Sequence, residues 1–310
     1  MLIGILSRKR SLYSTGRLRE SAGRLGHDTL VLDPLQCDLV FGRRAPDIFY
    51  RGLGRKLPEL DVVLPRIGAS ITERGLAVVN QFDMQGVPLV NNSQPIARSR
   101  DKLRSLQLLA RAGLDIPKTV MARHPSQVKA ALEIVGGPPA ILKLLRGTQG
   151  IGVILAETEQ MMQQVLETFW SLGMTILIQE FIEESEGRDI RAMVVGKRVV
   201  TAMRRQARVG EFRSNVHRGG TGVVVELPEA YKAAALRATR IMGLQLAGVD
   251  MLESREGPKV MEINSTPGFE GIERCSGVDV GSAIIEYAVS FARRRQRAGR
   301  SAAAVPPAGD

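Results

Sequence analysis

The segment AGVDMLESREGPKVMEIN, residues 247–264, has the pattern of two apolar strands joined by a short turn. The first strand carries Asp250 and the second carries Glu262. A hairpin brings the two carboxylates together, because directly opposed side chains of paired strands lie about 5 Å apart. Side chains two residues apart share a face of a strand, so Asn264 points the same way as Glu262. The segment therefore predicts a β-hairpin that presents two carboxylates and an amide on one face.

These three side chains suggest a metal site. Two facing carboxylates repel each other and raise each other's pKa unless a cation lies between them. Mg²⁺ prefers oxygen ligands, usually one or two carboxylates together with the phosphates of a substrate. We therefore interpret Asp250, Glu262 and Asn264 as ligands of a divalent metal ion.

The remaining pattern predicts an α/β N-terminal part followed by α+β parts. Strands alternate with helices over the first ninety residues, which favours a parallel, doubly wound sheet. No GxGxxG follows the first strand, so a dinucleotide site is not indicated. The glycine- and arginine-rich segment 41–57 is expected to be a mobile loop. The expected N-terminal strands are 2–6, 28–33, 61–66 and 88–92, with helices over 14–25 and 72–85.

Downstream, Ser93 is expected to cap one long helix that runs to about Arg111. A Gly196-Lys197 turn is expected to join two of the later strands. The expected strands are 116–122, 140–145, 153–157, 175–182, 189–196, 198–205, 247–252 and 259–264, and the expected helices begin at Pro125 and cover 158–171, 229–242 and 279–294.

The loop RGTQGIG, residues 146–152, joins two expected strands and contains Gly147, Gly150 and Gly152. Glycine lets backbone amides approach a polyanion closely, and Lys143 in the preceding strand can add an ammonium group. The alternative is an ordinary glycine hairpin beside a lysine that keeps its charge in water. The loop lacks the GxxxxGK[ST] pattern of a Walker A motif.

Two further segments carry charged side chains. QEFIEESEGRD, residues 179–189, can offer backbone groups to an adenine and a carboxylate to ribose hydroxyls, although an acidic surface turn has the same composition. EFRSNVHRGG, residues 211–220, contains Arg213, Asn215 and Arg218, and guanidinium groups bind phosphates and carboxylates bidentately. A solvated arginine loop is the alternative, and RRQAR (204–208) is expected to widen the positive field.

Composition limits the class of protein. The net charge is +11, which favours an acidic partner, and the tail from residue 289 holds five arginines and one aspartate. Aromatic residues make up 4% of the chain, too few for binding of single-stranded nucleic acid by stacking. Two distant cysteines fit a reducing cytoplasm, and three isolated histidines lack metal-ligand spacing. No segment reaches the length of a membrane span, so we expect a cytoplasmic protein.

Taken in order, RDKLRSLQLLA, KLLRGTQGIGV, QEFIEE, FRSNVHRGG, AGVDML and MEINSTPGFEGIE resemble the ATP-grasp ligases, and more closely the RimK-type ribosomal-protein glutamate ligases. The resemblance covers residues 1–288. It implies an N-terminal Rossmann-like pre-ATP-grasp domain (1–92) and two ATP-grasp lobes (93–185 and 186–288). The basic tail (289–310) lies outside the resemblance, and its low complexity predicts that it is disordered.

The resemblance also implies roles for individual residues. Lys143 and the loop glycines would hold phosphates, Glu180 and Phe181 would form the adenine hinge, and Asp189 would face the ribose. Arg213, Ser214 and Asn215 would line the nucleotide and acyl-phosphate site, with Arg213 and Asn215 catalytic. The cofactors would be ATP and two Mg²⁺ or Mn²⁺ ions, held by Asp250, Glu262 and Asn264.

The implied reaction adds L-glutamate by α-peptide bonds to the acidic C-terminus of a small-subunit ribosomal protein, or makes free poly-α-glutamate. The implied assembly is a homo-tetramer, and the basic tail could contact the ribosome. Two alternatives remain open: an ATP-grasp ligase with another acceptor, such as a carrier protein or small peptide, and a ribosome-associated RNA-binding protein. The complete set of Lys143, Asp250, Glu262 and Asn264 argues against the second.

Overall fold

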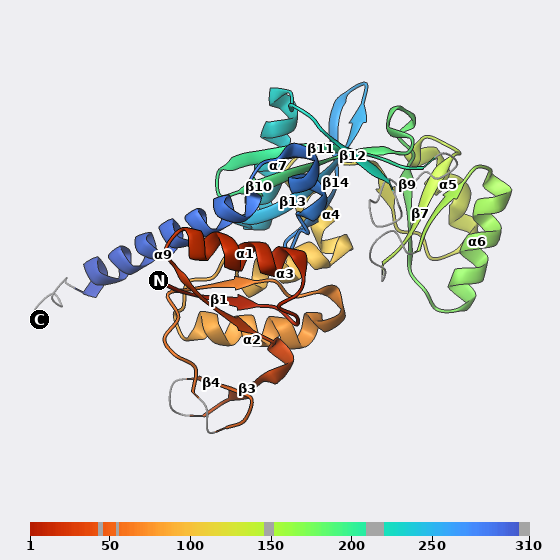
Figure 1. Cartoon of the computed structure of the whole chain (residues 1–310). Helices are drawn as coiled ribbons and strands as arrows, with labels where there is room; N and C mark the ends of the chain where they lie inside the picture. The colour runs from red at the N-terminus through yellow and green to blue at the C-terminus, as the bar shows by residue number, and fades with distance from the viewer. Residues whose placement is uncertain (43–45, 54–55, 146–151, 209–219, 304–310) are drawn as a thin grey trace, which may run out of the picture.

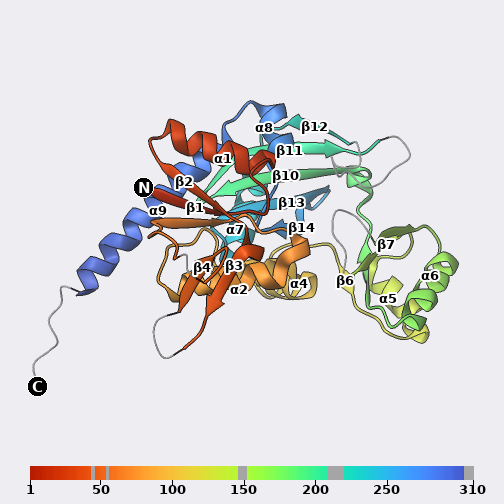
Figure 2. The same ribbon diagram turned by 60° about the horizontal axis from the view of Figure 1, so that its bottom comes forward.

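The computed structural model describes residues 1–42, 46–53, 56–145, 152–208 and 220–303. Three bodies are visible in Figures 1 and 2: an N-terminal unit, a central sheet with its helices, and a middle lobe set apart from both. Among the described residues, no helix is long and apolar enough to cross a membrane.

The N-terminal unit contains the predicted parallel sheet, with strand order β2-β1-β5. Its strands are β1 (Leu2–Leu6), β2 (Asp28–Leu32) and β5 (Val62–Pro65), and its helices are α1 (Tyr13–Arg24) and α2 (Thr72–Met84). Two predictions here were wrong. Residues 88–92 form only an isolated bridge between Leu89 and Val63. The described part of 41–57 contains β4 (Asp47–Tyr50), which pairs with β3 (Cys37–Val40).

The long helix predicted from Ser93 is two helices, α3 (Ser93–Arg100) and α4 (Lys102–Arg111). Asp101 lies between them with extended backbone angles, φ −86° and ψ 101°. Its carboxylate accepts a hydrogen bond of 2.9 Å from the amide of Arg104, so it begins a new helix instead of continuing the first.

The middle lobe has its own four-stranded sheet, in the order β6-β9-β7-β8, covered by two helices. Its apolar core is formed within the lobe and includes Leu142, Leu166 and Ile178. Its elements are β6 (Thr119–Val120), α5 (Val128–Val135), β7 (Ala140–Leu144), β8 (Val153–Ala156), α6 (Glu159–Ser171) and β9 (Ile176–Glu180).

The central sheet has the order β12-β11-β10-β13-β14. Helix α7 and the segment around Leu109 in α4 pack against one of its faces. Because α3 and α4 also contact α7 and β14, we place the start of the middle lobe after α4 and not at residue 93. The elements are β10 (Arg188–Val195), β11 (Arg198–Gln206), β12 (Thr221–Val224), α7 (Glu229–Met242), β13 (Leu246–Ser254), β14 (Gly257–Asn264), α8 (Glu270–Ser276) and α9 (Val280–Ala303).

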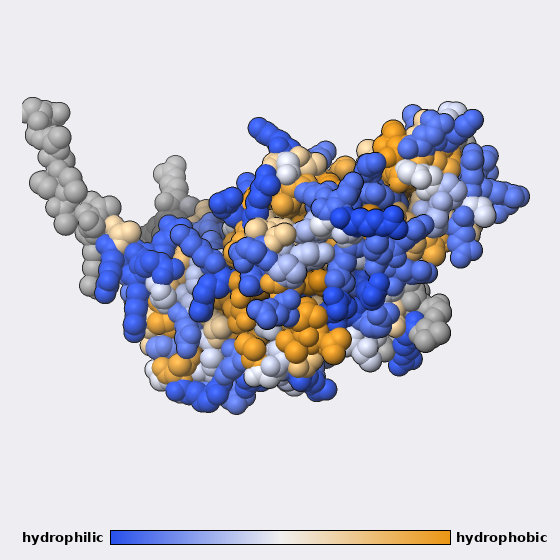
Figure 3. Space-filling model, turned by 90° about the horizontal axis from the view of Figure 1, so that it is seen from above, coloured by the Kyte–Doolittle hydropathy of each residue, from blue (hydrophilic) through white to orange (hydrophobic). Residues whose placement is uncertain are grey.

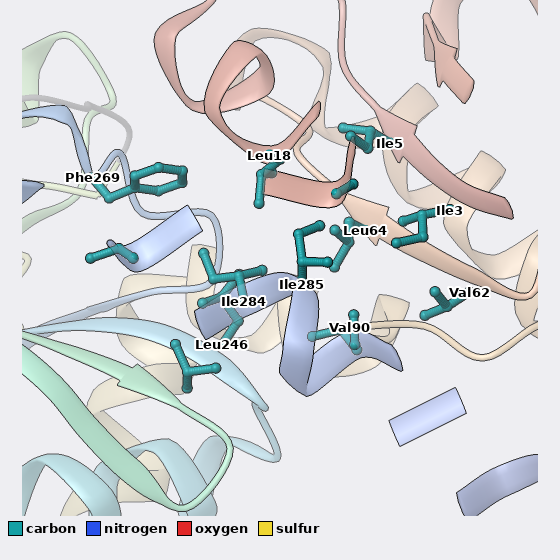
Figure 4. Packing of buried hydrophobic residues seen from close by; sticks show 14 of the residues in the cluster. Ile3, Ile5, Leu18, Val62, Leu64, Val90, Leu246, Phe269, Ile284 and Ile285 are labelled. Carbon is teal, nitrogen blue, oxygen red and sulfur yellow. The ribbon is translucent and has the colours of Figure 1, made fainter. Parts of the chain in front are cut away.

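The other face of the central sheet shares a core with the N-terminal unit. Ile5 and Leu18 of that unit cluster with Leu246, Phe269 and Ile285, as Figure 4 shows. Burying one continuous set of apolar side chains fixes the two bodies against each other. The N-terminal unit and the central sheet therefore form one packed body, and the middle lobe is the separate one.

The basic tail was predicted to be disordered from residue 289, which was wrong for most of its length. Helix α9 continues to Ala303, and Val289 and Ala292 are buried in the shared core. The helix then extends away from the body in Figures 1 and 2. On the face seen in Figure 3, hydrophilic residues cover most of the surface around separate apolar patches.

Candidate active site

The predicted metal ligands lie on one face of the central sheet. Asp250 of β13 is directly paired with Glu262 of β14, and Gly248 is paired with Asn264. A register shift next to this pair marks a β-bulge, a feature that often re-aims side chains beside active sites. The alternation predicted for β14 holds here, because Ile263 is buried in the opposite face while Glu262 is exposed.

Two arginines on the neighbouring strands bind the buried carboxylates of this face. Arg191 donates to both oxygens of Asp250, at 2.7 and 2.6 Å. Arg205 donates to both oxygens of Asp189, at 2.5 Å each, and its Nη2 lies 3.0 Å from Asp250 Oδ2. Burial alone would raise the pKa of Asp250, but Arg191 and Arg205 lower it below its ordinary value.

These pairs correct two predictions. The charge of Asp250 is already compensated within the protein, so the carboxylate pair does not depend on a metal ion alone. Arg205 was expected to contribute to a surface field, but only 3% of its side chain is exposed. The missed signal was the spacing of Asp189 and Arg191, two residues apart on one strand and hence on one face.

Glu262 differs from Asp250 in its surroundings. Among the described residues it has no hydrogen bond or ion pair. Its side chain remains open to solvent, yet protein atoms crowd its carboxylate. This desolvation, together with the charge of Asp250, raises the pKa of Glu262. Lys143, Arg191 and Lys102 act in the opposite direction but do not outweigh these two effects, so the negative charge of Glu262 is only partly compensated.

The residues fit a divalent metal ion. Asn264 Nδ2 lies 3.5 Å from Asp250 Oδ2, which leaves the amide oxygen of Asn264 free of that contact. Asp250, Glu262 and Asn264 would hold the ion, whose positive charge would remove the unfavourable interaction at Glu262. When bound, such an ion would neutralise negative charge on a phosphate group placed beside it.

Two lysines lie close enough to Glu262 for its charge to affect their pKa values. Desolvation lowers the pKa of Lys143, in β7, to about 8, while the charge of Glu262 acts to raise it. Lys102, at the start of α4, donates to the carbonyl of Leu144 over 3.0 Å. Burial also lowers the pKa of Lys102, and Glu262 partly offsets that effect. The sequence had indicated Lys143 but not Lys102, whose only signal was the capping residue Asp101 before it.

The glycine loop lies only partly within the described residues. Gly147 and Gly150 fall outside them. Gly152 has a φ of +76°, and a Cβ there would lie 2.6 Å from the side chain of Leu144. Its carbonyl accepts the amide of Leu144 at 2.8 Å. Glycine is thus required where the loop returns to β8 beside Lys143.

The predicted adenine hinge occupies the link between two bodies. Strand β9 ends at Glu180 and β10 begins at Arg188, so Phe181 lies where the chain leaves the middle lobe. The carboxylate of Glu180 accepts the amide of Lys118 at 2.9 Å. The adenine and ribose contacts stay predictions, and in this structure Arg205 already binds both oxygens of Asp189.

The other predicted site residues cannot be placed. Arg213, Ser214, Asn215 and Arg218 lie outside the described residues.

Comparison with known proteins identifies the family of the chain. The RimK PreATP-grasp domain matches residues 1–96, and the RimK-like ATP-grasp domain matches residues 99–288. A probable alpha-L-glutamate ligase of Vibrio atlanticus is 53% identical over 287 residues, covering 93% of this chain and 95% of the relative. The probable alpha-L-glutamate ligase 1 of Shewanella denitrificans is 52% identical and covers 93% and 97%.

Solved structures share the fold at lower identity. The ATP-grasp ligase PsnB complexed with its minimal precursor has a TM-score of 0.75 at 21% identity, covering 94% of this chain and 98% of that one. A RimK domain protein from Sphaerobacter thermophilus has a TM-score of 0.69 at 22% identity, covering 93% and 100%. Two domain matches that together span most of the sequence show that this chain belongs to the RimK-like ATP-grasp family of ADP-forming carboxylate–amine ligases.

Proposed function

We propose that this protein is an α-L-glutamate ligase that adds L-glutamate to an acidic C-terminus through an acyl phosphate. The observation that carries the proposal is that the charge of Glu262, which is paired with Asp250 across β13 and β14, acts on both Lys143 and Lys102. Cations on one side and metal ligands on the other suit a triphosphate bound between the middle lobe and the central sheet.

The chemistry runs in two balanced steps. A carboxylate oxygen of the acceptor attacks the γ-phosphorus of ATP, the bond to the β-phosphate oxygen breaks, and ADP leaves. The amine of glutamate then attacks the acyl carbon, and the bond between that carbon and the phosphate oxygen breaks. Inorganic phosphate departs, and the proton lost by the amine passes to phosphate or water. Neither step requires a nucleophile from the protein, so positioning and charge neutralisation suffice.

The residues divide this work by position. Lys143 and Lys102 hold and neutralise phosphate oxygens, and Asp250, Glu262 and Asn264 hold Mg²⁺ or Mn²⁺, with two ions per site. We assign the adenine to Glu180 and Phe181, the ribose to Asp189, and the reacting groups to Arg213, Ser214 and Asn215.

The acceptor we propose is the C-terminus of a small-subunit ribosomal protein in the cytoplasm, with free poly-α-glutamate as a second product. The net charge of +11 supports an acidic acceptor. We further propose a homo-tetramer and a ribosome contact through the arginine-rich end of α9, where Arg293, Arg294, Arg295 and Arg297 are exposed.

The test is an amino-acid panel. Enzyme, ATP and Mg²⁺ are incubated with glutamate, aspartate, glutamine or lysine, with and without a glutamate-ended peptide, and ADP release and product mass are measured. We expect a ladder of products from glutamate alone. Strong activity on another amine without a glutamate ladder would identify a ligase for a different amine donor.

A further inference from the structure

Arg66 connects the N-terminal unit to the loop that follows the metal ligands. It comes directly after β5, at the carboxyl end of the parallel sheet, where ligands of α/β proteins commonly bind. Its Nη2 donates to the carbonyl of Pro267 over 2.6 Å, and its guanidinium lies 5.6 Å from the ring centroid of Phe269. Only 8% of the residue is exposed.

Two of the three guanidinium nitrogens of Arg66 lack a partner. Among the described residues, neither Nε nor Nη1 has a hydrogen bond, although both are buried. The hydroxyl oxygen of Thr266, next to Pro267, is also buried without a partner. A buried polar group without a hydrogen bond is destabilising, and more so when it is charged, so three of them around one loop need an explanation.

Nearby residues with comparable positions are satisfied. Asn91 holds the same loop through the carbonyl of Ser265 at 3.0 Å, and its remaining groups bond to Gln245 and Leu246. Arg205 is as buried as Arg66, but it binds two carboxylates. Burial lowers the pKa of Arg66 to about 10, and no carboxylate among the described residues offsets the effect. Within the part of the chain that the structure describes, Arg66 is therefore a buried cation without a carboxylate partner.

The position of Arg66 joins it to the proposed reaction centre. Pro267 packs on Gly248, where a Cβ would lie 2.8 Å from the Pro267 Cβ, and Gly248 is paired with Asn264. The two loops that enclose Arg66 are exposed at Gly68 and Gly268, and a Cβ at either would meet no atom within 4 Å. Figure 4 shows Phe269 of the second loop at the edge of the core shared with the N-terminal unit.

We propose that Arg66, with the hydroxyl of Thr266, binds a carboxylate of the acidic substrate at the junction of the N-terminal unit and the 265–269 loop. An arriving carboxylate supplies the missing counter-charge and accepts hydrogen bonds from Nε and Nη1, while Thr266 donates its hydroxyl. Both groups are covered here, so the loop shifts when the substrate enters. This assignment rests on the proposed function and gives the N-terminal unit a part in selecting acidic substrates.

Three variants test the assignment: Arg66→Gln, Arg66→Lys and Thr266→Val. We expect Arg66→Gln to raise KM for glutamate or for a glutamate-ended peptide at least tenfold, with less than a twofold change in affinity for a non-hydrolysable ATP analogue with Mg²⁺. Lysine can keep the bond to Pro267 but cannot supply the guanidinium's other donors, so Arg66→Lys should recover little of the loss. Thr266→Val should also raise that KM while its Tm stays equal or rises, because a buried unpaired hydroxyl is removed.

Arg100→Lys is the matched control, because Arg100 bonds to the carbonyls of Ile67 and Gly68 and to the Thr72 hydroxyl. It should leave KM for the acidic substrate within twofold. If Arg66→Gln lost affinity for the nucleotide and for the acidic substrate equally, or if Arg66→Lys had the wild-type KM, Arg66 would only support the loop structurally and would not bind substrate. If the wild-type enzyme makes no glutamate ladder, the proposed substrate is wrong. The KM values of the wild type and the three variants are then compared for whichever carboxylate substrate drives ADP release. An unchanged KM for that substrate in all three variants would overturn the site.

Discussion

At the residue scale, two carboxylates of one site differ in how the protein compensates their charge. Asp250 is 2% exposed and is held by Arg191 and Arg205, whereas Glu262 faces solvent without a partner among the described residues. The hairpin pattern was enough to predict that Asp250 and Glu262 are neighbours. It could not predict the arginines, because they lie on two earlier strands, β10 and β11, and only the folded sheet brings them alongside Asp250.

This difference predicts unequal effects of neutralising the two carboxylates. Asp250→Asn leaves Arg191 without its carboxylate, so we expect a loss of about 3–5 kcal/mol in stability together with loss of ligation. Glu262→Gln should abolish ligation while stability is unchanged or slightly higher, because it removes repulsion with Asp250. Denaturant titration and ADP release check both. Equal stability losses, or ordinary ADP formation at normal Mg²⁺ concentrations, would contradict the assignment.

The depressed pKa of Lys143 predicts a trade between stability and nucleotide binding. In the folded, ligand-free protein, Lys143 is charged below about pH 8 and that charge is desolvated. The pKa of Lys143 is higher in the unfolded chain, so the desolvated charge lowers the stability of the fold. Lys143→Met should therefore raise Tm at pH 7, with the gain disappearing toward about pH 10. Affinity for an ATP analogue should fall in the variant. In the wild type it should weaken as pH rises through about 8.

Calorimetric titration between pH 6.5 and 9 gives the affinities, and thermal unfolding gives the stabilities. An affinity in Lys143→Met equal to that of the wild type across this range would remove Lys143 from the phosphate site.

At the element scale, the sequence predicted most strands and helices but not that the helix expected over 93–111 is divided in two. The pattern from 93 to 111 is helical throughout, and only the capping geometry of Asp101 divides it. That division places Lys102 in the first turn of α4, where its ammonium reaches the carbonyl of Leu144. Strand β12 and helix α8 escaped prediction because four to seven residues carry too little periodic signal.

The cap predicts a measurable effect on binding. Asp101→Ala should cost about 1 kcal/mol of stability and also weaken the affinity for nucleotide, since Lys102 is displaced with the helix end. Thr158→Ala is the matched control, because Thr158 caps α6 through the amide of Met161 at 3.1 Å, on the covering helix of the middle lobe. It should lose similar stability with unchanged affinity. Equal affinities for the two variants would show that the α4 cap has no role in the site.

At the scale of the whole molecule, the N-terminal unit and the central sheet share a core, while the middle lobe has its own. The order of the domains could be predicted from the motifs, but the shared core could not. Its contacts join residues near 5 and 18 to residues near 246 and 285, which are distant in the sequence and meet only in the folded protein. The same packing explains the tail, where Val289 and Ala292 hold α9 in place and its arginine-rich end continues outward.

The packing of α9 predicts where the chain can be shortened. Truncation after Gln296 should keep ligation of small substrates and Tm close to the wild type, because the residues removed lie beyond the core. Truncation after Ala288 removes the buried Val289 and Ala292 and should lower Tm by several degrees. The Ala288 truncation removes all four exposed arginines and the Gln296 truncation removes only Arg297 of these four, so the Ala288 truncation should weaken salt-dependent binding to ribosomal particles more if the arginines contact phosphate. Loss of glutamate ligation in the folded Gln296 truncation would contradict this division.

The central claim is that this site joins glutamate to an acidic acceptor at the expense of ATP. The most direct measurement incubates the enzyme with ATP, Mg²⁺ and a glutamate-ended peptide, with glutamate or glutamine as donor, and records product masses with ADP release. The account predicts a ladder in steps of one glutamate residue, one ADP for each step, and no ladder from glutamine. Equal ladders from both donors, or ADP release without peptide extension, would contradict it.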